Sequence, residues 1–179
     1  YFTGAWDMKL WKSDFFGNWD NAMGSAVDGD GSESGTLVTS NAQAFQSPEA
    51  GYYTVSIDFS TLSYKWTKLE NQTPTEYTYI SLAGGFNGWG DTDMTQVSNS
   101  NTHNWYISNL EIAEASEFKF KANHDWTVNW GSDADLTKTY FGVGAQNGSN
   151  IVLPAGTYNI YFNDITGQFV VEAVEAAQL

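Results

Sequence analysis

The sequence contains no cysteine and no arginine, only two histidines, and no hydrophobic run of the roughly 18 residues that a transmembrane helix requires. Without cysteine, disulfides, thiolate zinc sites and cysteine nucleophiles are all excluded. Seven bases, all lysine, stand against 21 acids, which gives a net charge of −14. Because phosphate recognition depends on clustered cations, this balance argues against nucleic acid and other polyanions as partners. Neutral molecules and cations remain as ligands.

What the sequence has in abundance is aromatic residues, at 16% of 179 residues, together with 17 glycines. Short aromatic or β-branched runs alternate with turn residues, and no segment has helical periodicity. Strict alternation from Gly156 to Asp164 predicts a half-buried strand. Across a turn at 165–167, Gln168–Glu172 is its expected hairpin partner. The predicted fold class is all-β and antiparallel.

An internal repeat divides the chain. Ala50–Thr61 lies over Ala155–Thr166 without gaps, at an offset of 105 residues. Upstream, Lys9-Leu10 lies over Lys119-Phe120 with a slightly different offset, as loop insertions require. We therefore expect two homologous units that both end in the same hairpin.

The boundary between the units is expected in the polar segment Glu70–Thr75, whose proline does not fit inside a central strand. This predicts one unit over 1–72 and a complete sandwich over 73–179. The first unit already begins at the strand that matches Glu117–Lys121. It is therefore expected to be an incomplete β-sandwich, truncated at its N-terminus, in a fragment of a longer protein.

A series of aromatic motifs in the second unit points to a known family. In chain order the motifs are Phe86-Asn87-Gly88-Trp89, Met94, Trp105, Phe118-Lys119-Phe120 and Trp126. This order resembles the glycogen- and starch-binding β-sandwich modules found beside α-glucan enzymes and kinases. Together with Asn129-Trp130-Gly131 and Phe162–Gly167, it is similar to the SusE/SusF outer-membrane starch-binding lipoproteins of Bacteroides-type bacteria. The resemblance covers Tyr77–Val171 well and the first unit only in its second half.

The resemblance implies tandem immunoglobulin-like β-sandwiches that bind a neutral polysaccharide without catalysis, cofactor or metal. Starch or another α-glucan is the favoured ligand. The resemblance also implies a location on the extracellular face of the outer membrane and association with outer-membrane proteins that import the glycan. Weak single sites on tandem units would then act together on a long polymer.

The same resemblance assigns the sugar site. Glycogen-binding modules hold their ligand with two tryptophans, a lysine and an asparagine, and the matching positions are Trp89, Trp126, Lys119 and Asn150. Tryptophan suits this role because it offers a flat apolar face and an N–H donor. Alternation along the strand places Lys119 and Lys121 on its outer face, about 7 Å apart. Lys119 is thus expected to donate to sugar hydroxyls, and Lys121 is a candidate solvated charge.

Other aromatic residues carry weaker expectations. Trp105 is predicted to fill the sandwich interior. Trp130 could stack on the ligand or pack under the turn at Asn129, and both alternatives stay open. In the first unit Lys9 matches Lys119 and Phe15 takes the place of Trp126, with Trp11 and Trp19 nearby, so a second sugar site there is a further hypothesis.

Three other functions are considered beside sugar binding. The loop Asp28–Gly35 has the alternating oxygens of a calcium site at Asp28 and Asp30 but lacks a distal bidentate glutamate, which favours a surface turn. A glycosidase needs paired carboxylates in a tuned pocket, but no acid of this chain lies in an evident apolar segment, and Glu111, Glu114 and Glu117 lie in a turn-rich one. A structural or adhesion pair of sandwiches would bury Trp89 and Trp126, whereas a starch site or a site for another neutral glycan would expose them.

Overall fold

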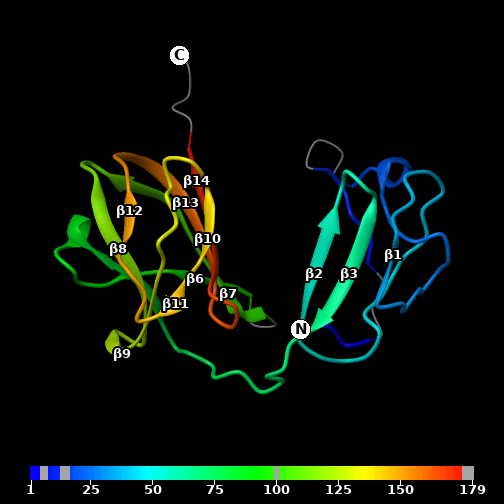
Figure 1. Ribbon diagram of the computed structural model, residues 1–179, viewed down its shortest axis with the longest axis horizontal. Coiled ribbons are helices and arrows are strands. Elements are labelled where there is room, and N and C mark those ends of the chain that lie inside the picture. Colours follow the sequence, from blue (N-terminus) through cyan, green and yellow to red (C-terminus); the bar gives the residue numbers. More distant parts are fainter. Residues whose placement is uncertain (5–7, 13–16, 99–100, 175–179) are drawn as a thin grey trace, which may run out of the picture. The chain divides into compact units, whose positions relative to one another are not determined.

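The computed structural model describes residues 1–4, 8–12, 17–98 and 101–174 (Figure 1). The chain divides into two compact units, Tyr1–Pro74 and Thr75–Leu179. Within the described residues the only helical segments are the short 3₁₀ turns Trp19–Asn21 (η2) and Gly85–Asn87 (η3), and the paired strands of every sheet run antiparallel. The predicted all-β, antiparallel fold is confirmed.

The first unit is built on a three-stranded sheet in the order β1-β3-β2. Its strands are β1 (Ser34–Thr36), β2 (Tyr53–Asp58) and β3 (Ser63–Lys68). Isolated bridges such as Met8 to Phe45 and Leu10 to Met23 join the extended segments outside the sheet. The core of this unit consists of the buried residues Leu37, Phe45, Tyr64 and Trp66. Phe45 stacks on Tyr64 with ring centroids 5.0 Å apart, which joins the bridged segments to the sheet.

Asp30, a candidate calcium ligand, makes internal hydrogen bonds instead. Its carboxylate accepts from Ser25 Oγ at 2.7 Å, from the Tyr64 hydroxyl at 2.9 Å and from the Ser32 backbone N–H at 3.0 Å. The bonds from Ser25 and Ser32 lower the pKa of Asp30 to about 2. Burial and the contact with Asp30 raise the pKa of Tyr64 to about 12. Asp30 therefore stabilises the first unit by fixing the loop to a core tyrosine.

We expect the first unit to lose stability in acid through Asp30. Because its folded-state pKa is about 2, below the ordinary 3.8, the carboxylate stabilises the fold above about pH 4 and stops doing so as the pH falls through 2. Asp30→Asn should lower the thermal midpoint of this unit at neutral pH and flatten its decline between those values. Thermal unfolding across this pH range checks the prediction. Asp28→Asn, in the same exposed loop, is the matched control, and identical midpoints for the two variants at every pH would contradict the acceptor role of Asp30.

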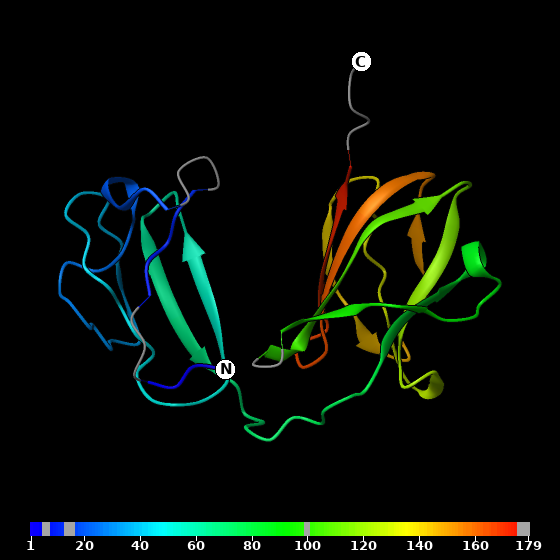
Figure 2. The same ribbon diagram turned by 180° about the vertical axis from the view of Figure 1, so that it is seen from behind.

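The second unit consists of two antiparallel sheets packed face to face (Figure 1 and, from behind, Figure 2). One sheet comprises, in spatial order, β10 (Phe141–Val143), β14 (Gln168–Ala173), β13 (Gly156–Asn163), β7 (Asn101–Ile112) and β6 (Thr95–Ser98). The other comprises β11 (Ala145–Gln146), β9 (Asp125–Gly131), β8 (Ser116–Ala122), β4 (Ile80–Gly84) and β5 (Thr92–Asp93), with β12 (Ile151–Leu153) also paired to β8. This two-layer arrangement is a β-sandwich.

Aromatic rings from both sheets fill the interior of this sandwich. Phe120 of β8 stacks on Phe162 of β13 with ring centroids 4.1 Å apart and an interplanar angle of 9°. Trp105 of β7 is 2% exposed, which confirms it as a core residue. Such contacts between the sheets set the position of β8, whose outer face carries the candidate lysines.

Trp130 also lies in this core, so the hypothesis that it stacks on a ligand is wrong. It is 8% exposed and meets Tyr77 and Phe162 edge to face. The physical reason is a register shift in the β8–β9 ladder, where Trp130 pairs with Phe120 but Ala122 already pairs with Asp125. The extra residues of β9 form a bulge, so simple alternation does not relate Trp130 to its neighbours near the turn.

A buried polar cluster joins β7 to the end of β13. The Asp164 carboxylate accepts a hydrogen bond from Trp105 Nε1 at 2.8 Å and lies 2.7 Å from His103 Nδ1. Its side chain is only 1% exposed. Burial raises the pKa of Asp164, and the hydrogen bonds from Trp105 and His103 oppose this rise. The cluster holds together a part of the core where the Trp105 N–H would otherwise lack an acceptor.

The repeat in the sequence is a repeated hairpin. β2 pairs with β3, with Val55 opposite Trp66, and β13 pairs with β14, with Ile160 opposite Val171. Val55 and Ile160 are 105 residues apart, as are Trp66 and Val171, which is the offset of the sequence repeat. The expectation that both units close with the same hairpin is confirmed.

Candidate functional site

Trp89 leaves the end of β4 in a tight glycine-rich turn held by one side chain. Asn87 Oδ1 accepts from the Gly84 N–H, and Asn87 Nδ2 donates to the Leu82 carbonyl and to Thr92 Oγ1, each at 2.9 Å. Trp89 has φ +63°, which bulky residues rarely adopt and which costs on the order of 1–3 kcal/mol. The turn imposes this conformation, and the Trp89 residue is left 38% exposed.

Trp126 reaches the same surface from β9, which lies on the other side of β8 from β4. It follows a two-residue β-turn in which Asn123 and His124 have φ +50° and +58°, typical of a type I′ hairpin turn. The bulge in β9 turns Trp126 outward, and it is 43% exposed. Its ring centroid lies 6.0 Å from that of Trp89, and the two ring planes are inclined at 49°. Both indoles are exposed, as the binding hypothesis requires.

An ion pair with a buried lysine and an exposed aspartate supports the Trp126 ring. Lys121 Nζ lies 4.7 Å from the ring centroid and 2.8 Å from Asp91 Oδ1, which also accepts from Ser81 Oγ at 2.7 Å. Burial on its own would raise the pKa of Asp91, but the hydrogen bonds from Lys121 and Ser81 outweigh it and leave the pKa below its ordinary value. The expectation of a solvated Lys121 is wrong, because its side chain is 4% exposed against the indole. Lys121 thus acts as a cation–π support.

Lys119 lies on the same strand and is half-buried. Its Nζ donates to Asn129 Oδ1 at 3.2 Å. Asn129 is 5% exposed and donates in turn to the Trp126 carbonyl at 2.8 Å and to Asn147 Oδ1 at 2.9 Å. Because an ammonium has three N–H donors and this bond uses one, Lys119 retains donors for a ligand. Asn129, which carried no prediction, connects Lys119 to the backbone of Trp126.

Asn150 immediately precedes β12, which is paired with β8. Ile151 pairs with Phe118, so the antiparallel register places Asn150 next to Lys119. The Asn150 side chain is exposed, and its Nδ2 donates to Glu117 Oε2 at 2.9 Å. Because this bond uses only the Nδ2 atom, the amide oxygen of Asn150 can still accept from a ligand hydroxyl.

The first unit carries its own pair of indoles with a lysine. Trp11 meets Trp19 edge to face, with ring centroids 4.8 Å apart, and Trp19 is 66% exposed. Lys9 Nζ lies 5.5 Å from the Trp19 ring and donates to the Ala42 carbonyl at 2.7 Å. Phe15, the other residue expected at this site, lies outside the described residues. The lysine–tryptophan contact of the second unit therefore has a counterpart here.

A β-sandwich that presents a tilted indole pair beside lysines has the features of a carbohydrate-binding module, a non-catalytic class. The chain is similar to the SusE/SusF starch-binding proteins in part of its length. Residues 4–68 match the family model described as SusF, first starch-specific carbohydrate-binding module. The outer membrane protein SusF of Bacteroides thetaiotaomicron is 28% identical over 169 residues, covering 87% of this chain and 33% of the relative. The chain therefore spans about a third of that protein.

A crystal structure of SusF from Bacteroides thetaiotaomicron is also similar, with 20% identity, a TM-score of 0.42, and coverage of 94% of this chain and 40% of that one. The family model falls on the first unit, whereas the motifs predict the best agreement over Tyr77–Val171. Among the described residues, no helix has the length and apolar character needed to cross a bilayer.

Proposed function

We propose that this chain binds starch or a similar neutral α-glucan without catalysis, with its main site on the second unit. The observation that carries the proposal is the exposed pair of Trp89 and Trp126, with ring centroids 6.0 Å apart. The C–H faces of sugar rings stack on flat indoles, and the hydroxyls at the ring edges need a few polar groups nearby. We assign these polar groups to Lys119 and Asn150.

The angle between the two indoles favours a curved glycan. Successive glucose rings of an α-linked chain turn relative to one another, so they present their faces at an angle, whereas a β-1,4-linked chain is a flat ribbon. Ring planes inclined at 49° fit the turned faces better than the ribbon. Asn87 fixes the turn that carries Trp89 and Lys121 lies against the Trp126 ring before binding, which reduces the ordering that a ligand would have to impose.

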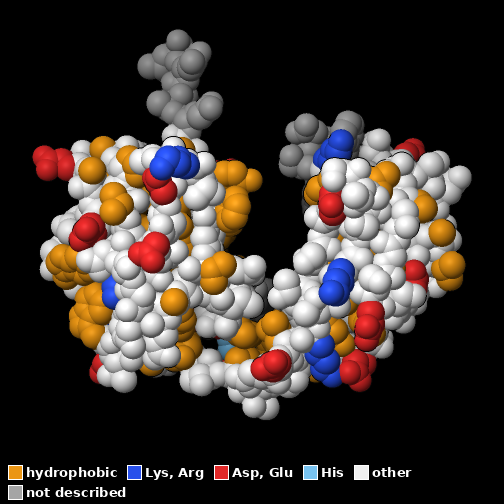
Figure 3. All heavy atoms as spheres, in the orientation of Figure 1, with side chains coloured by type: hydrophobic (Ala, Val, Ile, Leu, Met, Phe, Trp, Pro, Cys, Tyr) orange, Lys and Arg blue, Asp and Glu red, His pale blue; other side chains and the backbone are white. Residues whose placement is uncertain are grey.

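The charges around the site also suit a neutral ligand. Lys121 is already paired with Asp91, and the whole chain carries a net charge of −14. On the face drawn in Figure 3, acidic side chains are scattered over both units and the lysines do not gather into a patch. A polyanionic polysaccharide would therefore be repelled at long range and find no cationic cluster.

A second site on the first unit, formed by Trp11, Trp19 and Lys9, is part of the proposal. Its support is the contact of Lys9 with Trp19, which parallels that of Lys121 with Trp126. Two weak sites on one chain raise the effective concentration of the second site once the first has bound. Gain in affinity from short to long α-glucans is the expected consequence.

We further propose that the chain acts on the extracellular face of the outer membrane, next to proteins that import the glycan. The support for the location is that the relative SusF is named an outer membrane protein. A surface site that holds a long polymer would keep it within reach of such importers.

Titration calorimetry with maltoheptaose, cellohexaose and xylohexaose tests the proposed ligand. We expect maltoheptaose to bind at least about tenfold more tightly than the two β-linked chains, because only the α-linked chain offers both rings at the required angle. Equal affinity for all three would replace starch by a general neutral glycan. If none of the three gives a heat of binding, the proposal fails and the adhesion alternative returns.

A further inference from the structure

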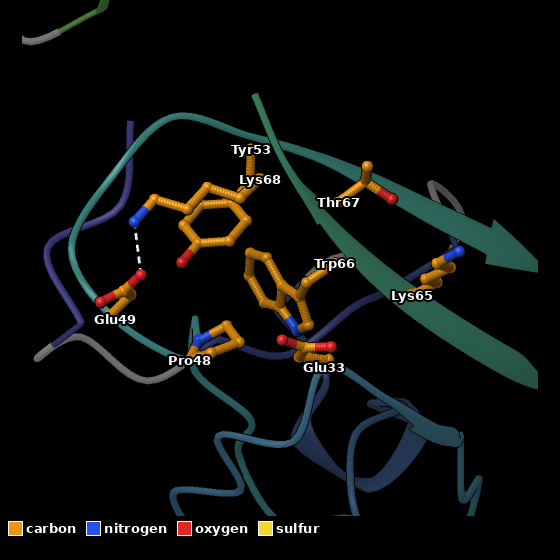
Figure 4. Close-up of a pocket in the computed structure, with 8 residues that line it drawn as sticks. All are labelled: Glu33, Pro48, Glu49, Tyr53, Lys65, Trp66, Thr67 and Lys68. Carbon is orange, nitrogen blue, oxygen red and sulfur yellow. Dashed lines mark hydrogen bonds and ion pairs between the residues drawn. The ribbon is translucent and has the colours of Figure 1, made fainter. Parts of the chain in front are cut away.

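The first unit contains a polar pocket that belongs to neither indole pair. The pocket has a volume of about 420 Å³ and lies at β3, between that strand and the segments before β1 and β2 (Figure 4). This volume lies within the range of small-molecule sites. The lining residues that matter for recognition are Glu33, Glu49, Tyr53, Lys65, Trp66 and Lys68.

Trp66 gives this pocket a buried N–H donor that has no hydrogen-bond acceptor in the described part of the chain. The residue is 3% exposed, and its Nε1 has no hydrogen-bond partner among the described residues. Figure 4 shows the nitrogen edge of the indole turned toward Glu33. Edge-to-face contacts with Phe2 at 4.8 Å and Tyr53 at 5.7 Å fix the ring in this orientation. Because a buried N–H without an acceptor is costly, a ligand atom that accepts from it is favoured.

The pocket around Trp66 is lined by equal numbers of acidic and basic side chains. Glu33 and Glu49 are acceptors, while Lys65 and Lys68 are donors, so the formal charge of the lining is zero. Lys68 is paired with Glu49. A hydroxyl group both donates and accepts, so it can bridge the indole N–H and the neighbouring carboxylate. A charged ligand would instead leave one pair of side chains opposed to a like charge.

From this geometry we infer that the pocket binds a neutral, hydroxyl-rich ligand of one or two sugar rings, gripped by its hydroxyl edge. One hydroxyl accepts from Trp66 Nε1–H and donates to the Glu33 carboxylate. Lys65 and the Lys68–Glu49 pair contact further hydroxyls at the pocket rim. Recognition here depends on hydrogen bonds at the ring edge, unlike the stacking proposed for the indole pairs.

The repeat separates this pocket from the indole sites. Trp66 corresponds to Val171 at the offset of 105 residues, and Val171 is 4% exposed in the core of the second unit. The pocket therefore has no tryptophan counterpart there. Within the first unit the counterpart of the indole site is Lys9 with Trp19. The inference does not require the proposed starch site to be correct.

Indole N–H spectra of the ¹⁵N-labelled full chain test the inference, with maltose as the probe and the Trp66 signal assigned from Trp66→Phe. We expect the Trp66 signal to shift saturably with maltose, and to do so equally in Trp89→Ala/Trp126→Ala, which lacks the proposed platforms. Glu33→Gln should weaken the response of Trp66 by about tenfold, because one hydrogen bond to a charged group is lost. Glu70→Gln, an exposed acid of the same unit outside the pocket, is the matched control and should leave the response unchanged.

The outcomes separate the pocket from the proposed starch site. If maltose shifts the signals of Trp89 and Trp126 but not that of Trp66, the pocket inference is overturned and the starch site stands. If maltose shifts the signal of Trp66 but not those of Trp89 and Trp126 in the unsubstituted chain, the pocket stands and the starch site fails. A stronger response of Trp66 to glucuronate than to maltose would overturn the assignment of a neutral ligand.

Discussion

Trp126→Ala is expected to weaken maltoheptaose binding at the second unit by about 30-fold, or about 2 kcal/mol, as for a central aromatic anchor of an interface. The variant removes one of the two platforms and uncovers the buried Lys121 side chain, which lies against the Trp126 ring. Because the first unit is proposed to bind as well, calorimetry should show the loss as a fall in the number of sites. Trp126→Phe keeps a smaller aromatic face, so its affinity for maltoheptaose should lie between those of the unsubstituted chain and Trp126→Ala.

Tyr140→Ala provides the matched control for this substitution. Tyr140 is an aromatic residue of the same unit with 66% exposure, and it lies outside the candidate site. It should bind maltoheptaose like the unsubstituted chain. Unchanged affinity and stoichiometry in a folded Trp126→Ala would show that the indole pair is not the binding surface.

Asp164→Asn is expected to lower the free energy of unfolding of the second unit by about 3 kcal/mol, because it breaks a buried charged cluster from one side. The carboxylate serves both Trp105 Nε1 and His103 Nδ1. A carboxamide has only one oxygen, so it cannot replace both contacts, and its NH₂ group would face a donor. Urea unfolding followed by hydrogen exchange of each unit measures the loss where it arises.

The control for this substitution is Asp133→Asn, which changes an exposed acid of the same unit. It should change the free energy of unfolding of the second unit by no more than about 0.5 kcal/mol. A loss below about 1 kcal/mol in Asp164→Asn would mean that the cluster is solvated or easily rearranged. Glycan binding should survive in Asp164→Asn at temperatures where the unit remains folded, because the cluster lies in the core.

The sequence predicted those features of the fold that depend on short-range patterns. The hairpin of β13 and β14 followed from alternation around a turn, and the gapless repeat placed β2 in the same role. Alternation placed Lys119 and Lys121 on the outer face of one strand, and Phe118 and Phe120, on its other face, are both buried. Such patterns are readable because one face of each strand is apolar and the period is two residues.

The environment of the candidate site could not be predicted in the same way. Alternation placed Lys121 on the outer face of β8, but nothing in the sequence indicates that Trp126 covers it. Trp126 and Trp130 are four residues apart, so alternation would put them on one face. The bulge in β9 sends them to opposite environments. A bulge depends on pairing between strands, which one sequence does not display.

Residues that position the indoles were missed for a related reason. Asp91 and Asn129 look like ordinary turn and strand polar residues, yet they bind the two lysines beside Trp126. Their roles arise from contacts that the segment before β5 and strand β9 make with the lysines of β8, rather than from local spacing. The positive φ of Trp89 is likewise a property of the folded backbone and cannot be read from the sequence.

The identical register of the two hairpins bears on how the chain avoids misassembly. Tandem domains with interchangeable strands are prone to exchange them while both are unfolded. Here an exchanged hairpin would force Trp66 into the space that fits Val171, and would leave a void where Trp66 belongs. Overpacking on one side and a cavity on the other both penalise the swapped state. The difference between Trp66 and Val171 thus favours pairing of each hairpin with its own unit.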